Sequence, residues 1–239
     1  MSLWELKLKG ELEMKLSKNL SKIAKKHDKT VSYSLDDAVE LVQKFKFVKF
    51  DESVDLAINL DVDPRHAEEN IRVTTPLPHG TGKLVKVLVL TEGPKEKEAQ
   101  EAGADFVGNK DFLTKIKNGW TDVDKIVATP DMMAIVGKLG KILGPKGLMP
   151  NPKLGTVTKD VKKTIIDIKA GLIEFKADKS GIVHAGIGKK SFSLDKLEEN
   201  YKNFIDAIIK AKPKGAKGTY LKSIFVSFTM GPSLKIINK

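Results

Sequence analysis

Residues 84–131 read LVKVLVLTEGPKEKEAQEAGADFVGNKDFLTKIKNGWTDVDKIVATPD, and this stretch decides the fold class. Its short apolar runs occupy 84–90, 104–108 and 124–130. They alternate with two polar segments of helical composition, which stop at Gly103 and near Asn118, and Asp131 opens a further helix. Short buried strands that alternate with helices predict β-α-β units on a parallel sheet. No GxGxxG follows the first strand, so the pattern does not support dinucleotide binding.

The next stretch, GKLGKILGPKGLMPNPKLGTVTK (137–159), has five lysines among five glycines and three prolines, with no acidic residue. Prolines remove backbone donors, and glycines permit positive φ, here expected at Gly144, Gly147 and Gly155. This punctuation predicts an irregular, positively charged loop instead of a regular helix or a central strand. Such a loop either binds an anionic surface or is a solvated connector, and composition favours neither.

Upstream of residue 84, one strand and one helix stand out. Ser34 is a candidate N-cap with Asp37 three residues later, which predicts a capped helix. Apolar and polar residues alternate over 53–61, which predicts a strand with one wet face. Phe50, just before this strand, is either a residue at the edge of the core or an exposed aromatic beside lysines. The polar segment 63–82 is expected to be a connection, and its LPHGTGKL tail lacks the spacing of a phosphate-binding loop.

Downstream of residue 159, we expect a helix over 160–170 that ends at Gly171, then a hairpin over 172–188, then an amphipathic helix capped by Ser193. The last strand is expected to place Ile224, Val226, Phe228 and Met230 on its buried side. Its other side carries hydroxyls at Ser223, Ser227 and Thr229, interrupted by Phe225. This polar side either bonds to sugar and phosphate or is the solvent face of a plain edge strand.

The composition favours a nucleic-acid-binding protein. The 239 residues carry a net charge of +11, and the sequence pI is about 9.5. A basic chain of this size binds phosphate-rich partners, first of all nucleic acid. Only two arginines occur, so the positive charge is almost entirely lysine, which suits contact with backbone phosphates.

Several classes of site and location are disfavoured. No cysteine is present, which excludes disulfides and thiolate zinc sites, and the four histidines lack metal-binding spacing. We therefore expect no metal and no cofactor. No apolar run approaches a membrane span, and residues 1–30, expected to be a basic arm, lack the features of a signal or transit peptide. A cytoplasmic location is the expectation.

Several long motifs together resemble the bacterial-type family of large-subunit ribosomal protein L-one, the protein of the mobile ribosomal stalk. These motifs are EAGADFVG (101–108), ATPDMM (128–133), KILGPKGLMPNPKLGTVT (141–158), FKADKSGIVHAGIGKKSF (175–192), PKGAKGTYLKSI (213–224) and TMGPSLKI (229–236). The resemblance runs from about Lys49 to the C-terminus and excludes roughly the first 30 residues.

The resemblance implies a two-domain fold of mixed α/β and α+β class. A discontinuous split β-α-β RNA-binding domain would comprise 1–80 plus 172–239. A Rossmann-like three-layer α/β/α domain would be inserted at 81–171, with a hinge near Gly80 and Gly171.

The resemblance also implies a set of RNA-contact residues. Carried over onto this sequence, these are Lys49, Phe50, Asp178, Lys179, His184, Lys189, Ser223, Ser227, Thr229, Met230 and Gly231. Within the loop at 137–159, near the domain junction, it implies secondary RNA contact by Lys141, Lys146 and Lys153.

The function implied by the resemblance is structural and not catalytic. The protein would bind large-subunit ribosomal RNA at the mobile stalk, assist release of deacylated tRNA from the exit site, and repress its own operon by binding the mRNA. It would be a monomer when free and would join a cytoplasmic rather than an organellar ribosome. An enzyme would need a phosphate-binding fingerprint or a clustered acid–base pair, and neither is found. A peripheral membrane protein would need a broad apolar face, whereas the stripe of helix 194–210 is better explained as core.

Overall fold

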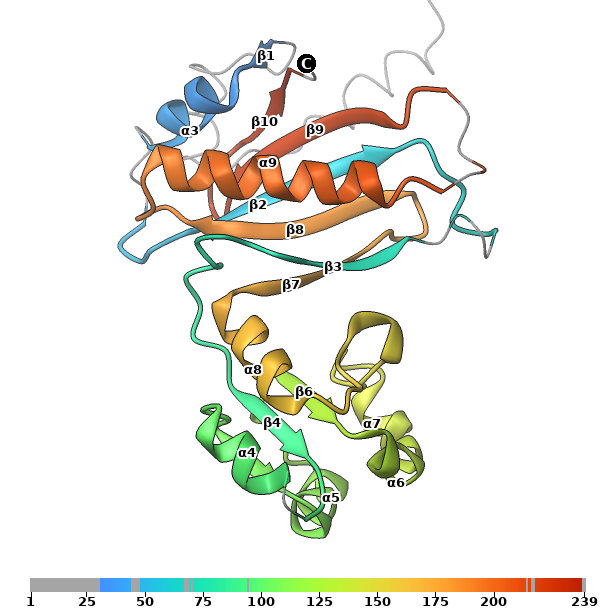
Figure 1. The fold of residues 1–239 in the computed structure, drawn as a ribbon. Coiled ribbons are helices and arrows are strands. Elements are labelled where there is room, and N and C mark those ends of the chain that lie inside the picture. Colours follow the sequence, from blue (N-terminus) through green and yellow to red (C-terminus); the bar gives the residue numbers. More distant parts are fainter. Residues whose placement is uncertain are drawn as a thin grey trace, which may run out of the picture.

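The computed structural model describes residues 31–43, 48–66, 69, 71–93, 95–213, 215 and 218–237. The arm expected over residues 1–30 lies outside the described residues. The chain folds into two layered units, which are joined by two connections (Figure 1). In the described ranges, no helix is long and apolar enough to cross a membrane.

The larger unit contains a five-stranded sheet in the order β1-β10-β9-β2-β8. Its strands are β1 (Ser32–Tyr33), β2 (Ser53–Leu60), β8 (Ile182–Lys189), β9 (Leu221–Phe228) and β10 (Ser233–Ile236). β9 runs antiparallel to both β2 and β10, and β1 is parallel to β10. The predicted strand over 53–61 is confirmed as β2. The short strands β1 and β10 were not predicted, because two and four residues carry too little periodicity.

One face of this sheet is buried beneath helix α9 (Leu194–Lys210), which lies across it in Figure 1. Alternate residues of β2 and β9 are buried, including Leu56 and Val226. They share a core with the apolar stripe of α9, where the ring of Phe204 meets the ring of Phe175 edge to face at 5.1 Å. The second helix of this unit, α3 (Leu35–Gln43), starts with the predicted capping box. There the Asp37 backbone N–H donates to Ser34 Oγ at 3.1 Å.

A two-stranded sheet, β3 (Arg72–Pro76) with β7 (Leu172–Lys176), lies beside β8 and corrects two predictions (Figure 1). β3 falls within 63–82, which was expected to be only a connection. The segment over 172–188 is not an ordinary hairpin, because β7 pairs with β3 and β8 pairs with β2. A single bridge, between Ala177 and Val183, joins the two arms near the turn.

The smaller unit confirms the β-α-β prediction. The parallel strands β4 (Val87–Leu90), β5 (Phe106–Gly108) and β6 (Lys125–Ala128) lie in the order β5-β4-β6. Its helices are α4 (Lys95–Glu101), α5 (Lys110–Lys117), α6 (Met133–Val136), α7 (Gly140–Leu143) and α8 (Val161–Ala170). The α8 helix ends, as predicted, at Gly171, which adopts a left-handed φ of 110°. Burial on both faces of β4 explains its uninterrupted apolar sequence.

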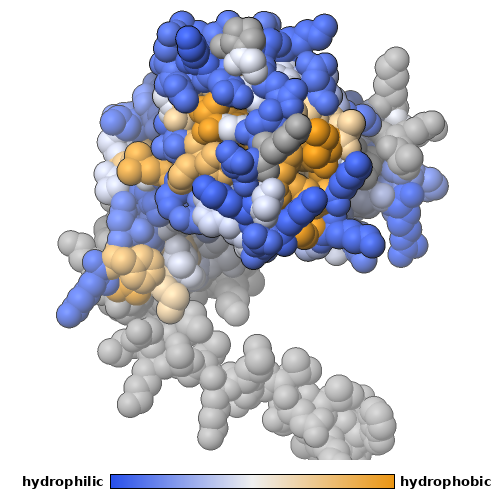
Figure 2. Space-filling view, turned by 90° about the horizontal axis from the view of Figure 1, so that it is seen from below, coloured by the Kyte–Doolittle hydropathy of each residue, from blue (hydrophilic) through white to orange (hydrophobic). Residues whose placement is uncertain are grey.

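Three aromatic rings pack together at the end of the smaller unit that lies farthest from the larger unit (Figure 1). The rings of Phe106, Phe112 and Trp120 contact one another, with centroids 5.3 to 5.9 Å apart. Gly108 leaves room for this, because a Cβ there would lie 2.5 Å from the Phe112 ring. Viewed from this end, apolar residues are surrounded by hydrophilic ones (Figure 2). The aromatic cluster is partly buried and packs against the core of the parallel sheet.

The stretch 137–159 is more helical than predicted. Short turns occupy Gly137–Leu139, Gly140–Leu143 and Pro152–Leu154. Gly147 and Gly155 have the expected positive φ, but Gly144 has a φ of −59°. A Cβ at Gly144 would lie 2.6 Å from the carbonyl oxygen of Gly140, so this glycine permits close approach of the chain. The expectation that no regular helix occurs in this stretch is wrong for Gly140–Leu143, which is a short α-helix, whereas no strand occurs over 137–159, as expected.

The two connections between the units pass each other at Gly80 and Gly171. A Cβ on Gly171 would lie 2.4 Å from the Gly80 Cα, so Gly171 has no room for a side chain. Asn200, fully buried on α9, fixes the first connection. Its side-chain amide donates to the carbonyl oxygens of Gly80 (3.0 Å) and Ile187 (2.7 Å), and its Oδ1 accepts the His79 N–H at 3.2 Å.

Candidate nucleic-acid interface

The second face of the five-stranded sheet carries mostly polar or small side chains, interrupted by Phe225 and Ile182. The pairing register arranges its residues in rows across β8, β2 and β9. From one end of the sheet to the other, the rows are Gly186–Asp55–Ser227, His184–Ala57–Phe225 and Ile182–Asn59–Ser223. Eight residues of β2 extend over about 27 Å. This surface, which we call the open face, brings His184, Ser223 and Ser227 together as expected.

Paired loops at the start of β2 form the first end of the open face. The Thr229 N–H donates to the Ser53 carbonyl at 3.2 Å, and the Ser53 N–H donates to Thr229 Oγ1 at 3.1 Å. Lys189 Nζ donates to Ser53 Oγ at 2.9 Å. Ser53 therefore joins the predicted contact residues Thr229 and Lys189, although it was not itself predicted. Because the Thr229 hydroxyl is already an acceptor within the protein, Thr229 has a structural role as well.

Glu52 is a further residue that the sequence analysis missed. It is only 3% exposed, although it is acidic. Its Oε1 accepts the Met230 N–H at 3.1 Å, and its Oε2 accepts Lys190 Nζ at 2.8 Å. On the preceding residue, the Asp51 carboxylate accepts both the N–H and the hydroxyl of Ser191. These contacts hold the loop before β2 against the ends of β8 and β9, and in the sequence only the two adjacent acids between Phe50 and the strand hinted at them.

Two large apolar side chains are exposed at this end. Phe50 is 55% exposed and Met230 is 58% exposed. The alternative of an exposed aromatic beside lysines is thus confirmed for Phe50, and Lys49 next to it is exposed as well. The expectation that Met230 lies on the buried side of the last strand is wrong, because β9 ends at Phe228. The chain then turns, and the Gly231 N–H donates to the Phe228 carbonyl at 2.9 Å.

The turn between β7 and β8 forms the second end of the open face. Asp178 Oδ1 accepts the N–H groups of Ser180 (2.8 Å) and Ile182 (3.0 Å). These two backbone donors, with a smaller contribution from His184, hold the pKa of the Asp178 carboxyl below its usual value. Its carboxylate therefore shapes the turn, while the neighbouring Lys179 is exposed to solvent. Predicted contacts at residues 178 and 179 lie far along the sheet from those at 49, 50 and 229–231.

Asp55 is the only acidic side chain in the rows of the open face. Partial withdrawal from water raises its pKa, and the nearby charges of Lys189 and His184 oppose that rise. Gly186 lies opposite, where a Cβ would sit 3.2 Å from Asp55 Oδ1. Gly186 thus keeps this part of the open face free of side chains. Gly188 does not, because it is buried against Leu197 and Phe192.

The three lysines predicted as secondary contacts do not lie on the open face. All three belong to the smaller unit. Lys141 is on α7, and Lys146 Nζ donates to Thr121 Oγ1 at 2.5 Å. Lys153 borders a groove of about 420 Å³ that also involves Thr74 of β3, so it is the one nearest the junction of the two units.

The chemistry of the open face suits binding and not catalysis. It offers hydroxyl, amide and ammonium groups over a bare surface, with apolar side chains at one end. Among the described residues, no group of three or more His, Asp or Glu side chains could hold a metal ion. Hydroxyls and cations on a shallow sheet can contact the 2′-hydroxyls and phosphates of an RNA minor groove.

Comparison with known protein families gives a match over most of the chain. The model of the ribosomal protein L1p/L10e family matches residues 42–232. The match spans the open face, both ends of it, and the whole parallel sheet. Ribosomal proteins are in general structural and not enzymatic. The chain belongs to the ribosomal protein L1p/L10e family.

Proposed function

We propose that the protein binds large-subunit ribosomal RNA at the mobile stalk through the open face. This proposal is supported above all by the arrangement of side chains at the first end of the open face. There, exposed Phe50 and Met230 stand beside Lys49 and Lys189 on loops that Glu52 holds in place. Apolar side chains beside cations are suited to bases or sugars that lie next to phosphates. A plain solvent-facing edge would not need a buried carboxylate to order its loop.

Two kinds of interaction would contribute to binding: long-range electrostatic attraction between lysines and phosphates, and short-range contact between the open face and the RNA surface. Lysines attract the RNA over long range and replace its counterions, which makes affinity fall steeply with salt. Ser223, Ser227 and Asn59 then offer short hydrogen-bonding groups, and Gly186 and Ala57 allow the RNA close to the sheet. A surface of this kind recognises shape and 2′-hydroxyls more than base sequence.

The two units are proposed to move as domains, 1–80 plus 172–239 and 81–171. The crossing of Gly80 and Gly171 supports a hinge there, since both have positive φ (63° and 110°) and neither has a side chain to interlock. Lys125 of β6 and Glu174 of β7 form an ion pair across this junction at 3.2 Å. Both side chains are partly buried, at 29% and 20% exposed, so a movement of the two units would have to break this pair.

From the stalk, the protein would brace its RNA while deacylated tRNA leaves the exit site. Lys141, Lys146 and Lys153 of the smaller unit would make secondary phosphate contacts. An mRNA segment with the same shape as the ribosomal site would compete for the open face, and the protein would then repress its own operon. In this account it acts as a monomer when free and within the ribosome otherwise.

The test is a pair of matched charge substitutions. Met230→Asp puts a carboxylate on the open face, whereas Ile209→Asp puts one on α9, at a side chain that is 49% exposed. Both change net charge by the same amount and leave the core intact. Binding to a stalk RNA fragment is measured by titration, with circular dichroism as a check on folding.

Met230→Asp is expected to weaken binding at least tenfold, since a carboxylate facing phosphate costs more than about 1.4 kcal/mol. Ile209→Asp should bind like wild type to within about twofold. Equal losses in both variants would mean that only net charge matters, and the open face would no longer be the site.

A further inference from the structure

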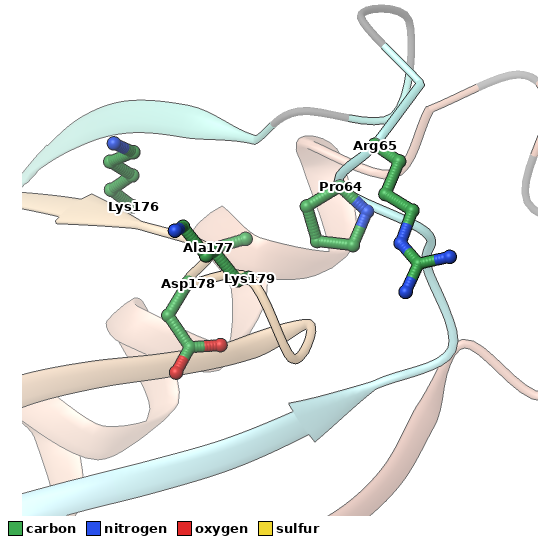
Figure 3. A pocket seen from close by; sticks show the side chains of 6 residues that line it. All are labelled: Pro64, Arg65, Lys176, Ala177, Asp178 and Lys179. Atoms are coloured by element: carbon green, nitrogen blue, oxygen red, sulfur yellow. The ribbon is translucent and has the colours of Figure 1, made fainter.

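A groove of about 630 Å³ begins where the open face ends. It lies between the loop that follows β2 and the β7–β8 turn (Figure 3). Pro64 and Arg65 line it from the loop, and residues 176–179 line it from the other side. Neither Arg65 nor Lys176 is used by the proposed function.

Among the described residues, the cations of this groove have no acidic partner. The chain has two arginines, and Arg72 is held by Glu174, with Nη2 to Oε1 at 2.7 Å. For Arg65, Lys176 and Lys179, no ion pair occurs within the described residues. Of the described acids of the loop, Asp61 pairs with Lys222, and Asp63 and Glu69 accept backbone N–H groups of the loop itself. Asp63 Oδ1 accepts the Arg65 N–H at 3.0 Å, leaving the guanidinium itself unpaired in the described part of the chain.

The one carboxylate in the groove does not neutralise it. Asp178 accepts two backbone N–H groups of its own turn. Figure 3 shows its carboxylate turned away from the Lys176 ammonium, with Arg65 on the facing loop. Three cations and one carboxylate leave an excess of two positive charges. The groove is therefore a site for anions.

The groove is continuous with the open face. The Leu60 N–H, at the end of β2, donates to the Gly181 carbonyl of the turn at 3.0 Å. One residue earlier on β2, Asn59 lies between Ser223 of β9 and Ile182 of β8 in the last row of the open face. An RNA strand lying along the open face and leaving at the Ser223 end would meet Arg65 next.

We propose that this groove binds backbone phosphate of the same RNA, beyond the sheet, with the Arg65 guanidinium as a forked clamp and Lys176 and Lys179 on the opposite side of the groove. Guanidinium matches phosphate with two parallel N–H bonds, which an ammonium group cannot reproduce. The proposal rests on the proposed function and extends it to a second, sequence-independent subsite.

The test compares Arg65→Gln and Arg65→Lys with wild type on a stalk RNA fragment across a salt series. Arg65→Gln is expected to lower affinity roughly tenfold and to reduce the slope of log affinity against log salt by about one unit, as for one lost phosphate contact. Arg65→Lys should restore the slope but only part of the affinity. Lys97→Gln, on α4 of the smaller unit, removes the same charge and should leave the slope unchanged.

A shortened RNA separates the groove from the open face. With the fragment trimmed at the end that leaves past Ser223, wild type and Arg65→Gln should bind equally. If Arg65→Gln matches wild type on the full fragment while Met230→Asp remains impaired, the groove proposal is refuted and the open face stands. If wild type itself shows no preference for stalk RNA, the proposed function fails and the groove proposal with it.

Discussion

Replacement of Glu52 by glutamine tests whether a buried carboxylate orders the RNA-binding loop. The Glu52 and Lys190 side chains are 4% and 18% exposed, and their Oε2 and Nζ atoms lie 2.8 Å apart. An amide in place of the carboxylate keeps one acceptor oxygen. This oxygen can accept from either the Met230 N–H or the Lys190 ammonium. The other donor then faces the amide NH₂ group of the glutamine and loses its hydrogen bond.

The magnitude follows from these contacts. Removing one partner of a fully buried ion pair costs about 3–5 kcal/mol, and a hydrogen bond to a charged group contributes about 1.5–3 kcal/mol. Lys190 keeps some contact with water, which places the expected loss at about 2–3 kcal/mol. In Glu52→Gln/Lys190→Met both charges are removed, and a methionine stem still packs near the Phe228 ring, which Lys190 Nζ approaches at 5.7 Å. The double variant should therefore be more stable than Glu52→Gln alone.

The assay is urea denaturation of wild type, both single variants and the double variant, followed by RNA binding under conditions where all are folded. Glu52→Gln should also weaken RNA binding, because the Thr229–Gly231 turn loses its anchor. A loss of stability below about 0.5 kcal/mol, or strictly additive effects in the double variant, would refute the inference that the pair acts as a unit.

Three further predictions concern other parts of the molecule. Asp55→Asn should raise the melting temperature at neutral pH and strengthen RNA binding. The raised pKa means that the folded protein favours the protonated form of Asp55, so the ionised carboxylate destabilises the fold at neutral pH. The gain in stability of the variant should therefore fade as the pH falls through the raised pKa of the folded state toward 3.8, the ordinary value. Asn200→Ala should cost about 3 kcal/mol in urea denaturation, since it leaves two buried carbonyls and one N–H unpaired, whereas the exposed Asn203→Ala one turn later should cost less than about 0.5 kcal/mol. Lys141→Ala with Lys146→Ala should weaken RNA binding less than Met230→Asp, with the salt slope reduced by at most about one unit per lysine; a larger loss would make that loop a primary site.

The sequence predicted the elements whose signals are local. Period-two burial over β2, the Ser34–Asp37 capping box and the alternation of strands and helices over 84–131 each arise within a few residues, and the structure confirms them. The helix ends at Asn118 and Gly171 follow from local backbone preference in the same way.

What the sequence could not predict depends on partners distant in the chain. β3 forms a strand because it pairs with β7, which lies about one hundred residues later in the chain. The turn-forming residues around β3 gave no sign of this pairing in the sequence. Glu52 is informative only once Met230 and Lys190 are known to surround it. Likewise, the exposure of Met230 depends on where β9 ends, since alternation extrapolated by one step places it in the core.

The most direct test of the central claim is competition binding. Purified protein is bound to a large-subunit stalk RNA fragment against excess unrelated structured RNA, over a series of salt concentrations. We expect the preference for the stalk fragment to persist at high salt, because the open face still recognises the shape of the RNA when salt screens the lysine charges. Preference that disappears as salt rises would contradict it and leave only a lysine-rich surface that binds RNA of any kind.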